Sequence, residues 1–137
     1  MFGIRAATAA DLPEIAAIQS ASPEAAHWNP TDYLAHDCFV ADVAGRIAGF
    51  LVSRQTAPGE REILNLAVDP AHRRQGIARR LLQAEFERAQ GAWYLEVRGS
   101  NIAAIELYKS AGFEIAGRRP GYYNNPVETG VVMRFFS

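Results

Sequence analysis

The chain has 137 residues, and its 14 lysines and arginines nearly balance 15 aspartates and glutamates. That length suits one globular domain, and a composition of 49% hydrophobic and 21% charged residues excludes an intrinsically disordered chain. The near-zero charge argues against binding of nucleic acid by charge alone, and the apolar runs are far shorter than the roughly 20 residues that span a membrane.

The first half of the chain predicts a helix followed by an antiparallel meander. A strand is expected over 4–7, and apolar residues recur at helical spacing after Thr8. A loop over 20–30 and a short helix over 31–36 follow. Three strands are then expected, separated by turns, over 39–43, 47–54 and 62–68.

The second half alternates between strands and helices. We expect a helix over 76–90, a strand over 92–97, a helix over 101–111 that ends at Gly112, and strands over 113–118 and 129–136. This order predicts an α/β (α+β) fold with a mixed sheet and helices packed on it. No linker or repeat divides the chain, so residues 1–137 are expected to form a single domain.

Cys38 is the single cysteine, which excludes an internal disulfide, and we expect it to be a buried small apolar group. No cluster of cysteine and histidine has metal-ligand spacing, so no metal is expected. The segment from Met1 to Arg5 lacks the charged start and long apolar run of a signal peptide. A cytoplasmic location is therefore the expectation.

The segment 68–79 leads from a strand into a helix, with Gly76 and Ala78 at the helix opening. Free N–H groups and the helix dipole at such a start favour an anion, and Arg73, Arg74 and Arg79 add positive charge. The spacing fits neither a P-loop nor a dinucleotide fingerprint. A surface helix with solvated arginines is the alternative interpretation.

Glu96 interrupts an apolar strand close to its carboxyl end, where ligands bind in open α/β sheets. Such a carboxylate is either paired with a cation, for example Arg98, or used to move protons. In the next helix Asn101, Ala104 and Tyr108 share one face. A ligand-binding face and an N-cap followed by a core tyrosine both remain open.

Together these motifs resemble the GCN5-related N-acetyltransferase (GNAT) superfamily, over most of the chain and most strongly over 63–113. The sequence R-R-Q-G-I-A at 73–78 is similar to the family's acetyl-CoA pyrophosphate loop, and N-x-x-A-x-x-x-Y-x-x-x-G-F at 101–113 is similar to its later cofactor helix. The segments 65–70 and 95–98, and Arg118-Arg119 before Tyr122-Tyr123, resemble the RimI-type ribosomal-protein-alanine N-acetyltransferases.

The resemblance implies a mostly antiparallel sheet of about six to seven strands, flanked by helices and splayed at the acetyl-CoA strand. It implies acetyl-CoA as cosubstrate, Glu96 as general base and Tyr108 as general acid. The cofactor-binding residues it implies are Leu66, Ala67, Val68, Arg73, Arg74, Gln75, Gly76, Ile77, Ala78, Arg79, Asn101, Ala104 and Tyr108.

The chemistry agrees with these roles. An amine attacks a thioester only when neutral, which at neutral pH costs about 1.4 kcal/mol for an α-amine and roughly 4.6 kcal/mol for a lysine. A carboxylate can accept the proton, and a main-chain N–H around 66–68 can hold the oxyanion if the strand is splayed or bulged there. A tyrosine beside the sulfur can protonate the leaving thiolate, so transfer is direct.

In this family the acceptor lies between an early loop and the last hairpin, which here contain Trp28, Tyr122 and Tyr123. These aromatics suit an extended peptide end, although each tyrosine alone could be a core residue. We therefore expect the acceptor to be a protein N-terminal α-amine, foremost of a ribosomal protein. The alternatives are a small-molecule amine (an amino acid, a polyamine or an aminoglycoside) and a non-catalytic module that binds coenzyme A. A monomer and a homodimer are both compatible with the sequence.

Overall fold

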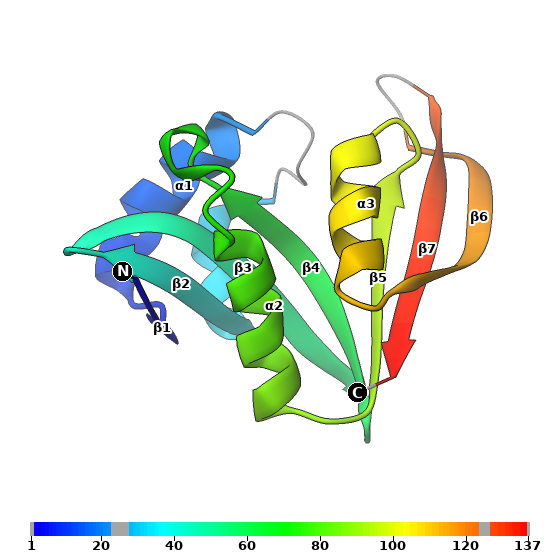
Figure 1. Cartoon of the computed structure of the whole chain (residues 1–137), viewed down its shortest axis with the longest axis horizontal. Helices are drawn as coiled ribbons and strands as arrows, with labels where there is room; N and C mark the ends of the chain where they lie inside the picture. The colour runs from blue at the N-terminus through cyan, green and yellow to red at the C-terminus, as the bar shows by residue number, and fades with distance from the viewer. Residues whose placement is uncertain (1, 23–27, 124–126, 137) are drawn as a thin grey trace.

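Alternating apolar residues along the strands build one seven-stranded sheet, with the order β1-β2-β3-β4-β5-β7-β6 (Figure 1). The computed structural model describes residues 2–22, 28–123 and 127–136. Among the strand pairs of these residues, only β4–β5 is parallel, which confirms the predicted mixed, mostly antiparallel sheet. The strands are β1 (Gly3–Ala6), β2 (Asp37–Val43), β3 (Arg46–Ala57), β4 (Glu60–Val68), β5 (Ala92–Arg98), β6 (Glu114–Tyr123) and β7 (Glu128–Phe136).

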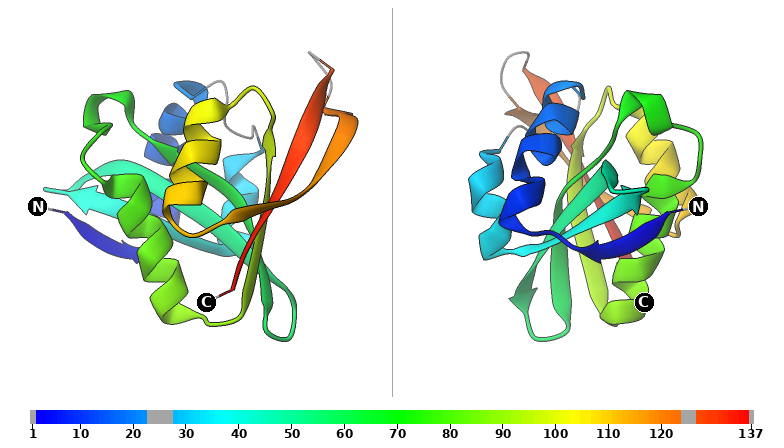
Figure 2. Two further views of the ribbon diagram at one scale, coloured as in Figure 1. Left: turned by 45° about the vertical axis from the view of Figure 1, so that its right-hand side comes forward. Right: turned by 90° about the vertical axis from the view of Figure 1, so that its left-hand side faces the viewer.

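Helices cover both faces of this sheet (Figure 2). One face packs against α1 (Leu12–Ser20) and the 3₁₀ helix η2 (Pro30–Ala35), and its core contains Ile15, Tyr33 and Phe50. The other face packs against α2 (Ile77–Arg88) and α3 (Ile102–Ser110), and its core contains Leu81 and Trp93. Two further 3₁₀ turns, η1 (Ala9–Asp11) and η3 (Pro70–His72), precede α1 and α2.

Most predicted elements are confirmed, with differences at their ends. The expected strand over 113–118 continues as β6 to Tyr123, through Pro120 and Gly121. Proline donates no ladder hydrogen bond, but β6 is the edge of the sheet, where that loss is tolerated. The register slips between Arg119 and Tyr123, which is where the two breakers lie. The short helix expected over 31–36 is the 3₁₀ helix η2.

The sheet splits between β4 and β5. These strands pair from Glu60 opposite Ala92 to Ile63 opposite Leu95, and no further pair joins them beyond that point in the described residues. On the other edge of β4, Val52 faces Asn65 and Ser53 faces Ile63, so Leu64 is an extra, bulged residue. The sequence predicted the opening at 66–68; it begins earlier, directly after Ile63.

Candidate active site

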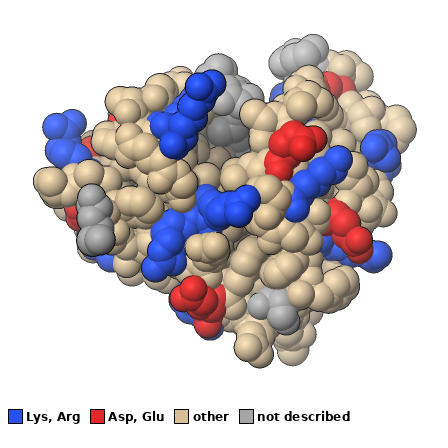
Figure 3. Space-filling view, viewed as in Figure 1, with Lys and Arg blue, Asp and Glu red and all other residues tan. Residues whose placement is uncertain are grey.

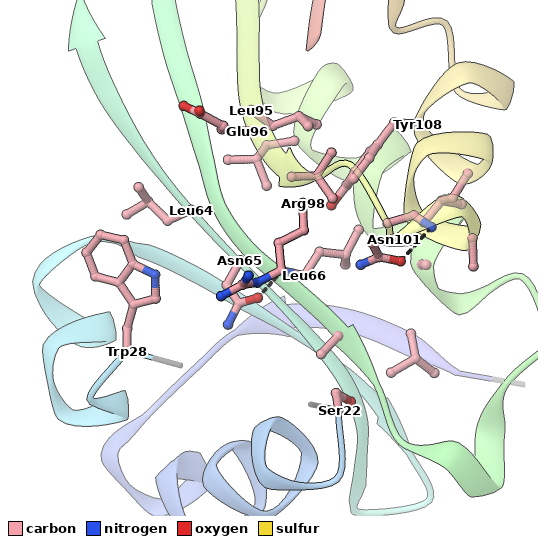
Figure 4. A pocket seen from close by; sticks show the side chains of 18 of the residues that line it. Ser22, Trp28, Leu64, Asn65, Leu66, Leu95, Glu96, Arg98, Asn101 and Tyr108 are labelled. Carbon is pink, nitrogen blue, oxygen red and sulfur yellow. Dashed lines mark hydrogen bonds between the residues drawn. The ribbon is translucent and has the colours of Figure 1, made fainter. Parts of the chain in front are cut away.

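A cavity of about 730 Å³ lies where β4 and β5 separate, and we call it the β4–β5 cavity. Side chains on this wall come from β4, β5, α3 and the segments that precede α2 and η2 (Figure 4). The predicted site residues that line it are Trp28, Leu66, Ala67, Val68, Arg73, Ala78, Glu96, Asn101, Ala104, Tyr108 and Tyr123. Residues distant in the sequence are thus brought to one opening.

The remaining predicted site residues do not line this wall: Arg74, Gln75, Gly76, Ile77, Arg79 and Tyr122. The Ile77 side chain is buried in the core beneath α2, so only its backbone can meet a ligand. Arg79 donates a hydrogen bond of 3.4 Å to the Ser110 carbonyl at the end of α3. That bond satisfies an open carbonyl at a helix C-terminus and directs Arg79 toward α3.

The β4 backbone presents hydrogen-bonding groups to the opening. The Asp69 N–H donates to the Ala48 carbonyl at 2.7 Å, and bonded and non-bonded pairs alternate along antiparallel strands. The N–H groups of Leu66 and Val68 therefore point away from β3, toward the gap left by β5. The Leu66 N–H donates to the Asn65 Oδ1 at 3.0 Å. An extended ligand group could pair with this edge as a further strand would.

The start of α2 suits an anion. Its N-cap, Gly76, has a left-handed backbone (φ +75°) and no side chain, so the first N–H groups of the helix are not capped by a side chain. The start of α3 differs, because the Asn101 Oδ1 accepts from the Ala104 N–H at 3.2 Å. Arg74 also has a positive φ, of 63°. Arginines on α2 and the loop before it lie on the face that Figure 3 displays. These features fit the pyrophosphate of a coenzyme.

Glu96 lies on the other side of β5 from the α3 helix. Trp93, Leu95 and Val97 are buried toward α2 and α3, so the alternation of the strand turns Glu96 to the opposite face (Figure 4). Burial raises the pKa of Glu96, and the nearby Arg119 opposes that shift. The ion pair joins Arg119 Nε and Glu96 Oε2 at 3.6 Å. The suggested pairing of Glu96 with Arg98 is wrong, because β6 rather than β5 supplies its partner.

Arg98 instead pairs with Glu128 of β7, with Nη1 and Oε2 3.2 Å apart. Arg98 is held further by the ring of Tyr123, 4.5 Å from its guanidinium carbon. The other oxygen of Glu128 accepts from the Ser100 N–H at 2.7 Å, which fixes the turn before α3. Glu128 therefore ties Arg98, which lines the cavity, to the turn between β5 and α3.

Tyr108 belongs both to the core and to the cavity. Its ring is 7% exposed and packs edge-on against Phe113, with centroids 5.6 Å apart. Within the described ranges, no protein group forms a hydrogen bond with its hydroxyl. Burial raises the pKa of the phenol well above its ordinary value, so the proton stays on oxygen at neutral pH. Asn101, in turn, is confirmed as the N-cap of α3 and also lines the cavity.

Trp28 and Tyr123 also line the cavity. Tyr122 is 49% exposed, so the interpretation of this tyrosine as a core residue is wrong. Its ring contacts that of Tyr123 edge-on, with centroids 5.1 Å apart. The expected loop over 20–30 and the hairpin after Tyr123 each include residues outside the described ones, namely 23–27 and 124–126.

A buried polar cluster lies behind β4, and none of its members except Trp28 is among the predicted site residues. Asn65 donates through Nδ2 to the Gln19 Oε1 and to the Tyr33 Oη, both at 3.1 Å, and the Tyr33 hydroxyl donates to Gln19. Gln19 then donates to the Trp28 carbonyl at 2.6 Å. The cluster connects the Leu66 N–H to the Trp28 backbone. The signal in the sequence was Asn65, a polar residue at a position of β4 where the apolar pattern of the strand predicts a buried side chain.

The described residues lack two further features. They contain no group of three or more His, Cys, Asp and Glu side chains that could hold a metal ion. None of their helices has the length and apolar character needed to cross a bilayer. Cys38 is buried, and desolvation raises the pKa of its thiol to about 12, so it stays protonated at neutral pH. That agrees with the expectation of a small apolar group.

Comparisons with known proteins agree with this geometry. The family model "Acetyltransferase (GNAT) family" matches residues 8–113. The N-alpha-acetyltransferase RimI of Mycobacterium tuberculosis is 43% identical over 93 residues, which cover 64% of this chain and 59% of that protein. The ribosomal protein bS18-alanine N-acetyltransferase of Escherichia coli is 45% identical over 83 residues, which cover 58% of this chain and 55% of that protein. The matched segments thus span little more than half of these relatives.

A solved structure extends the similarity to almost the whole chain. The crystal structure of the ribosomal-protein-S18-alanine N-acetyltransferase from Escherichia coli superposes with a TM-score of 0.83 at 29% identity, covering 99% of this chain and 94% of that one. A streptothricin acetyltransferase homologue in complex with acetyl coenzyme A, at 18% identity, shares the fold. The family model covers more than half of the residues. The chain therefore belongs to the GNAT acetyltransferase family.

Proposed function

We propose that the chain is an acetyl-CoA-dependent N-acetyltransferase that acetylates the N-terminal α-amine of a protein, foremost a ribosomal protein. The observation that carries the proposal is the β4–β5 cavity, whose wall contains Glu96 on one face of β5 and Tyr108 on the other. A ligand that passes between the parted strands would meet both side chains. A ribosomal acceptor would be met in the cytoplasm.

Acetyl-CoA would supply an acyl thioester in this opening. The uncapped start of α2, with Arg73 and Arg74 beside it, would hold the pyrophosphate, and the outward N–H groups of β4 would pair with the extended arm. Asn101 and Ala104 line the wall next to α3. The N–H of Val68, or that of Leu66 on release from the Asn65 Oδ1, would stabilise the oxyanion as the amine adds.

Glu96 would act as general base. Its carboxylate is largely buried, with 16% of the side chain exposed, and it is the only acidic side chain on the cavity wall within the described ranges. Burial raises its pKa toward neutrality, which suits a group that must take a proton from an ammonium and release it again. Tyr108, still protonated at neutral pH, would donate a proton or a hydrogen bond to the departing thiolate.

The charges of the cavity favour a peptide over a polyamine. Arg73 and Arg98 also line the wall, and the single carboxylate Glu96 is already paired with Arg119. A polyamine with several positive charges needs an acidic pocket, whereas a peptide end brings one α-amine and a backbone for the aromatic rings. The similarity to enzymes named for an alanine of ribosomal protein bS18 supports the same class of acceptor.

The test is a thiol-release assay with acetyl-CoA and three acceptor classes: peptides that begin with alanine, Nα-blocked lysine peptides, and polyamines. We expect transfer to the alanine peptides, with mass spectrometry locating the acetyl group on the α-amine. Glu96→Gln should abolish most of this turnover while acetyl-CoA still binds. If acetyl-CoA binds tightly but none of the acceptor classes is acetylated, the non-catalytic binding module becomes the better interpretation. If Glu96→Gln leaves turnover unchanged, Glu96 is not the general base.

A further inference from the structure

The carboxylate of Glu96 depends on one partner from the β6–β7 hairpin. Its Oε2 atom is buried and accepts no hydrogen bond from the described residues. The atom that approaches it is Arg119 Nε, at 3.6 Å. Room for this approach comes from Gly130, because a Cβ there would lie 2.5 Å from the same Oε2 atom. Gly130 pairs with Arg119 across β6 and β7, so the missing side chain opens the path between the two charges.

Arg119 is held in place although more than half of its side chain is exposed. Its guanidinium carbon lies 4.9 Å from the centre of the Tyr122 ring, a cation–π contact. Tyr122 in turn packs edge-on against Tyr123 at 5.1 Å. This stack along β6 restricts where the guanidinium can go. The Tyr122 ring therefore helps to keep the Arg119 guanidinium next to Glu96.

The other charged groups around Glu96 do not replace Arg119. From β4, Glu62 is a second carboxylate, and its charge opposes ionisation of Glu96. From β5 and β7, Arg98 and Glu128 neutralise each other at 3.2 Å. The nearest β7 neighbours, Val132 and Gly130, carry no charge, and burial raises the pKa of the Tyr123 phenol of β6, so that it stays neutral. Arg119 is thus the cation that offsets both the burial of Glu96 and the field of Glu62.

We propose that Arg119 is a positioning residue that keeps Glu96 ionised and aimed along the cavity wall until the amine of the acceptor arrives. This inference rests on the proposed function, because it assigns Arg119 a role through the general base. The approaching ammonium would compete with the guanidinium for the same carboxylate. Since the Arg119–Glu96 ion pair is partly exposed and therefore weak, a single ammonium group held against the cavity wall can displace Arg119 from Glu96.

The neighbouring Arg118 provides a matched control. It is also exposed and cationic, but it pairs with Val131, whose side chain is buried toward α3, so Arg118 points to the other face of the sheet. Arg119→Gln and Arg118→Gln therefore remove the same charge from adjacent positions, and only the first removes the partner of Glu96. Arg119→Lys keeps the positive charge, so Glu96 should titrate in this variant close to where it titrates in the wild type.

Two measurements test the proposal. In an NMR titration of isotope-labelled glutamate carboxyl groups, with the Glu96 signal assigned through Glu96→Gln, we expect Glu96 to titrate at higher pH in Arg119→Gln than in the wild type or in Arg118→Gln. In the pH profile of kcat/KM, the acidic limb should move in the same direction. A loss of about two- to five-fold is expected on that limb, with little change on the plateau.

An unchanged Glu96 titration in Arg119→Gln would overturn the proposal, and so would an equal shift in Arg118→Gln. The titration needs no turnover, so it tests the role of Arg119 even if the wild type fails to acetylate any amine. In that case the proposed function fails, while the dependence of Glu96 on Arg119 is still measured. If Glu96→Gln retains full activity, Glu96 is not the base, and a shifted titration no longer has a catalytic consequence.

Discussion

Replacing Tyr108 with phenylalanine separates the chemistry of the hydroxyl from the packing of the ring. The ring is 7% exposed and packs against Phe113, and both features survive the substitution. Since no described residue forms a hydrogen bond with the hydroxyl, its removal leaves no protein donor or acceptor unpaired. The free energy of unfolding should therefore change by no more than about 0.5 kcal/mol.

The effect on turnover should be far larger. Burial keeps the phenol protonated, and because its pKa lies above that of a thiol, about 8.5, the hydroxyl would share its proton with the departing sulfur through a hydrogen bond. A general acid contributes roughly 100- to 10,000-fold, which corresponds to about 3 to 5 kcal/mol on the barrier. We expect Tyr108→Phe to lower kcat by this range and to leave the KM for acetyl-CoA within about two-fold.

The assay is thiol release at saturating acceptor with acetyl-CoA varied, beside a thermal melt of each variant. Tyr94→Phe is the control, because it removes a hydroxyl from a tyrosine of β5 that does not line the cavity. A kcat within two-fold of the wild type would refute the role of Tyr108 as acid. A large rise in the KM for acetyl-CoA with unchanged kcat would make Tyr108 a packing residue instead.

Three further substitutions test other parts of the structure. Gly76→Glu should abolish acetyl-CoA binding, measured by calorimetry, because the side chain is bulky and carries the same charge as the pyrophosphate. Gly76→Ala should still fold, at a cost of about 1 to 2 kcal/mol from the positive φ at this position. Normal affinity of the glutamate variant would contradict the assignment of the pyrophosphate site. Tyr33→Phe should lower the free energy of unfolding by about 1 to 3 kcal/mol in urea titrations, because the buried amides of Gln19 and Asn65 lose a partner, and a neutral effect would mean that the cluster rearranges. Arg5 holds the pKa of Asp11 at about 2, below that of an ordinary carboxyl group. The ion pair therefore stabilises the fold at pH values above the ordinary carboxyl pKa. This stabilisation is lost as the pH falls through the lowered pKa of Asp11. Arg5→Met should therefore destabilise the protein at neutral pH, with the difference from wild type disappearing in acid, and a difference independent of pH would contradict this account.

The sequence predicted the order of strands and helices because their periodic patterns are local. The resemblance to the GNAT superfamily implied that Glu96 and Tyr108 share one site, and both side chains line the β4–β5 cavity. It could not predict that Arg119 pairs with Glu96, because β7 lies between β5 and β6 and their register is set only in the folded sheet. The sequence suggested Arg98 because it is the near neighbour along the chain.

The cluster around Asn65 was missed for a related reason. Its partners Gln19 and Tyr33 are 46 and 32 residues away in sequence, on elements that meet β4 only after folding. The bulge at Leu64 is likewise invisible locally, because it is a mismatch of register between β3 and β4. Pairings between distant segments, rather than local propensities, account for these omissions.

The short seam between β4 and β5 has a mechanical consequence. One part of the sheet, β1 to β4, is joined to the other, β5 to β7, by four residue pairs at one end, while the opposite end stands open. A ligand bound along the free edge of β4 would connect the two parts of the sheet across this opening. Binding of the acyl donor would then also raise the melting temperature, because the same ligand that brings the acyl group would hold the two parts of the sheet together.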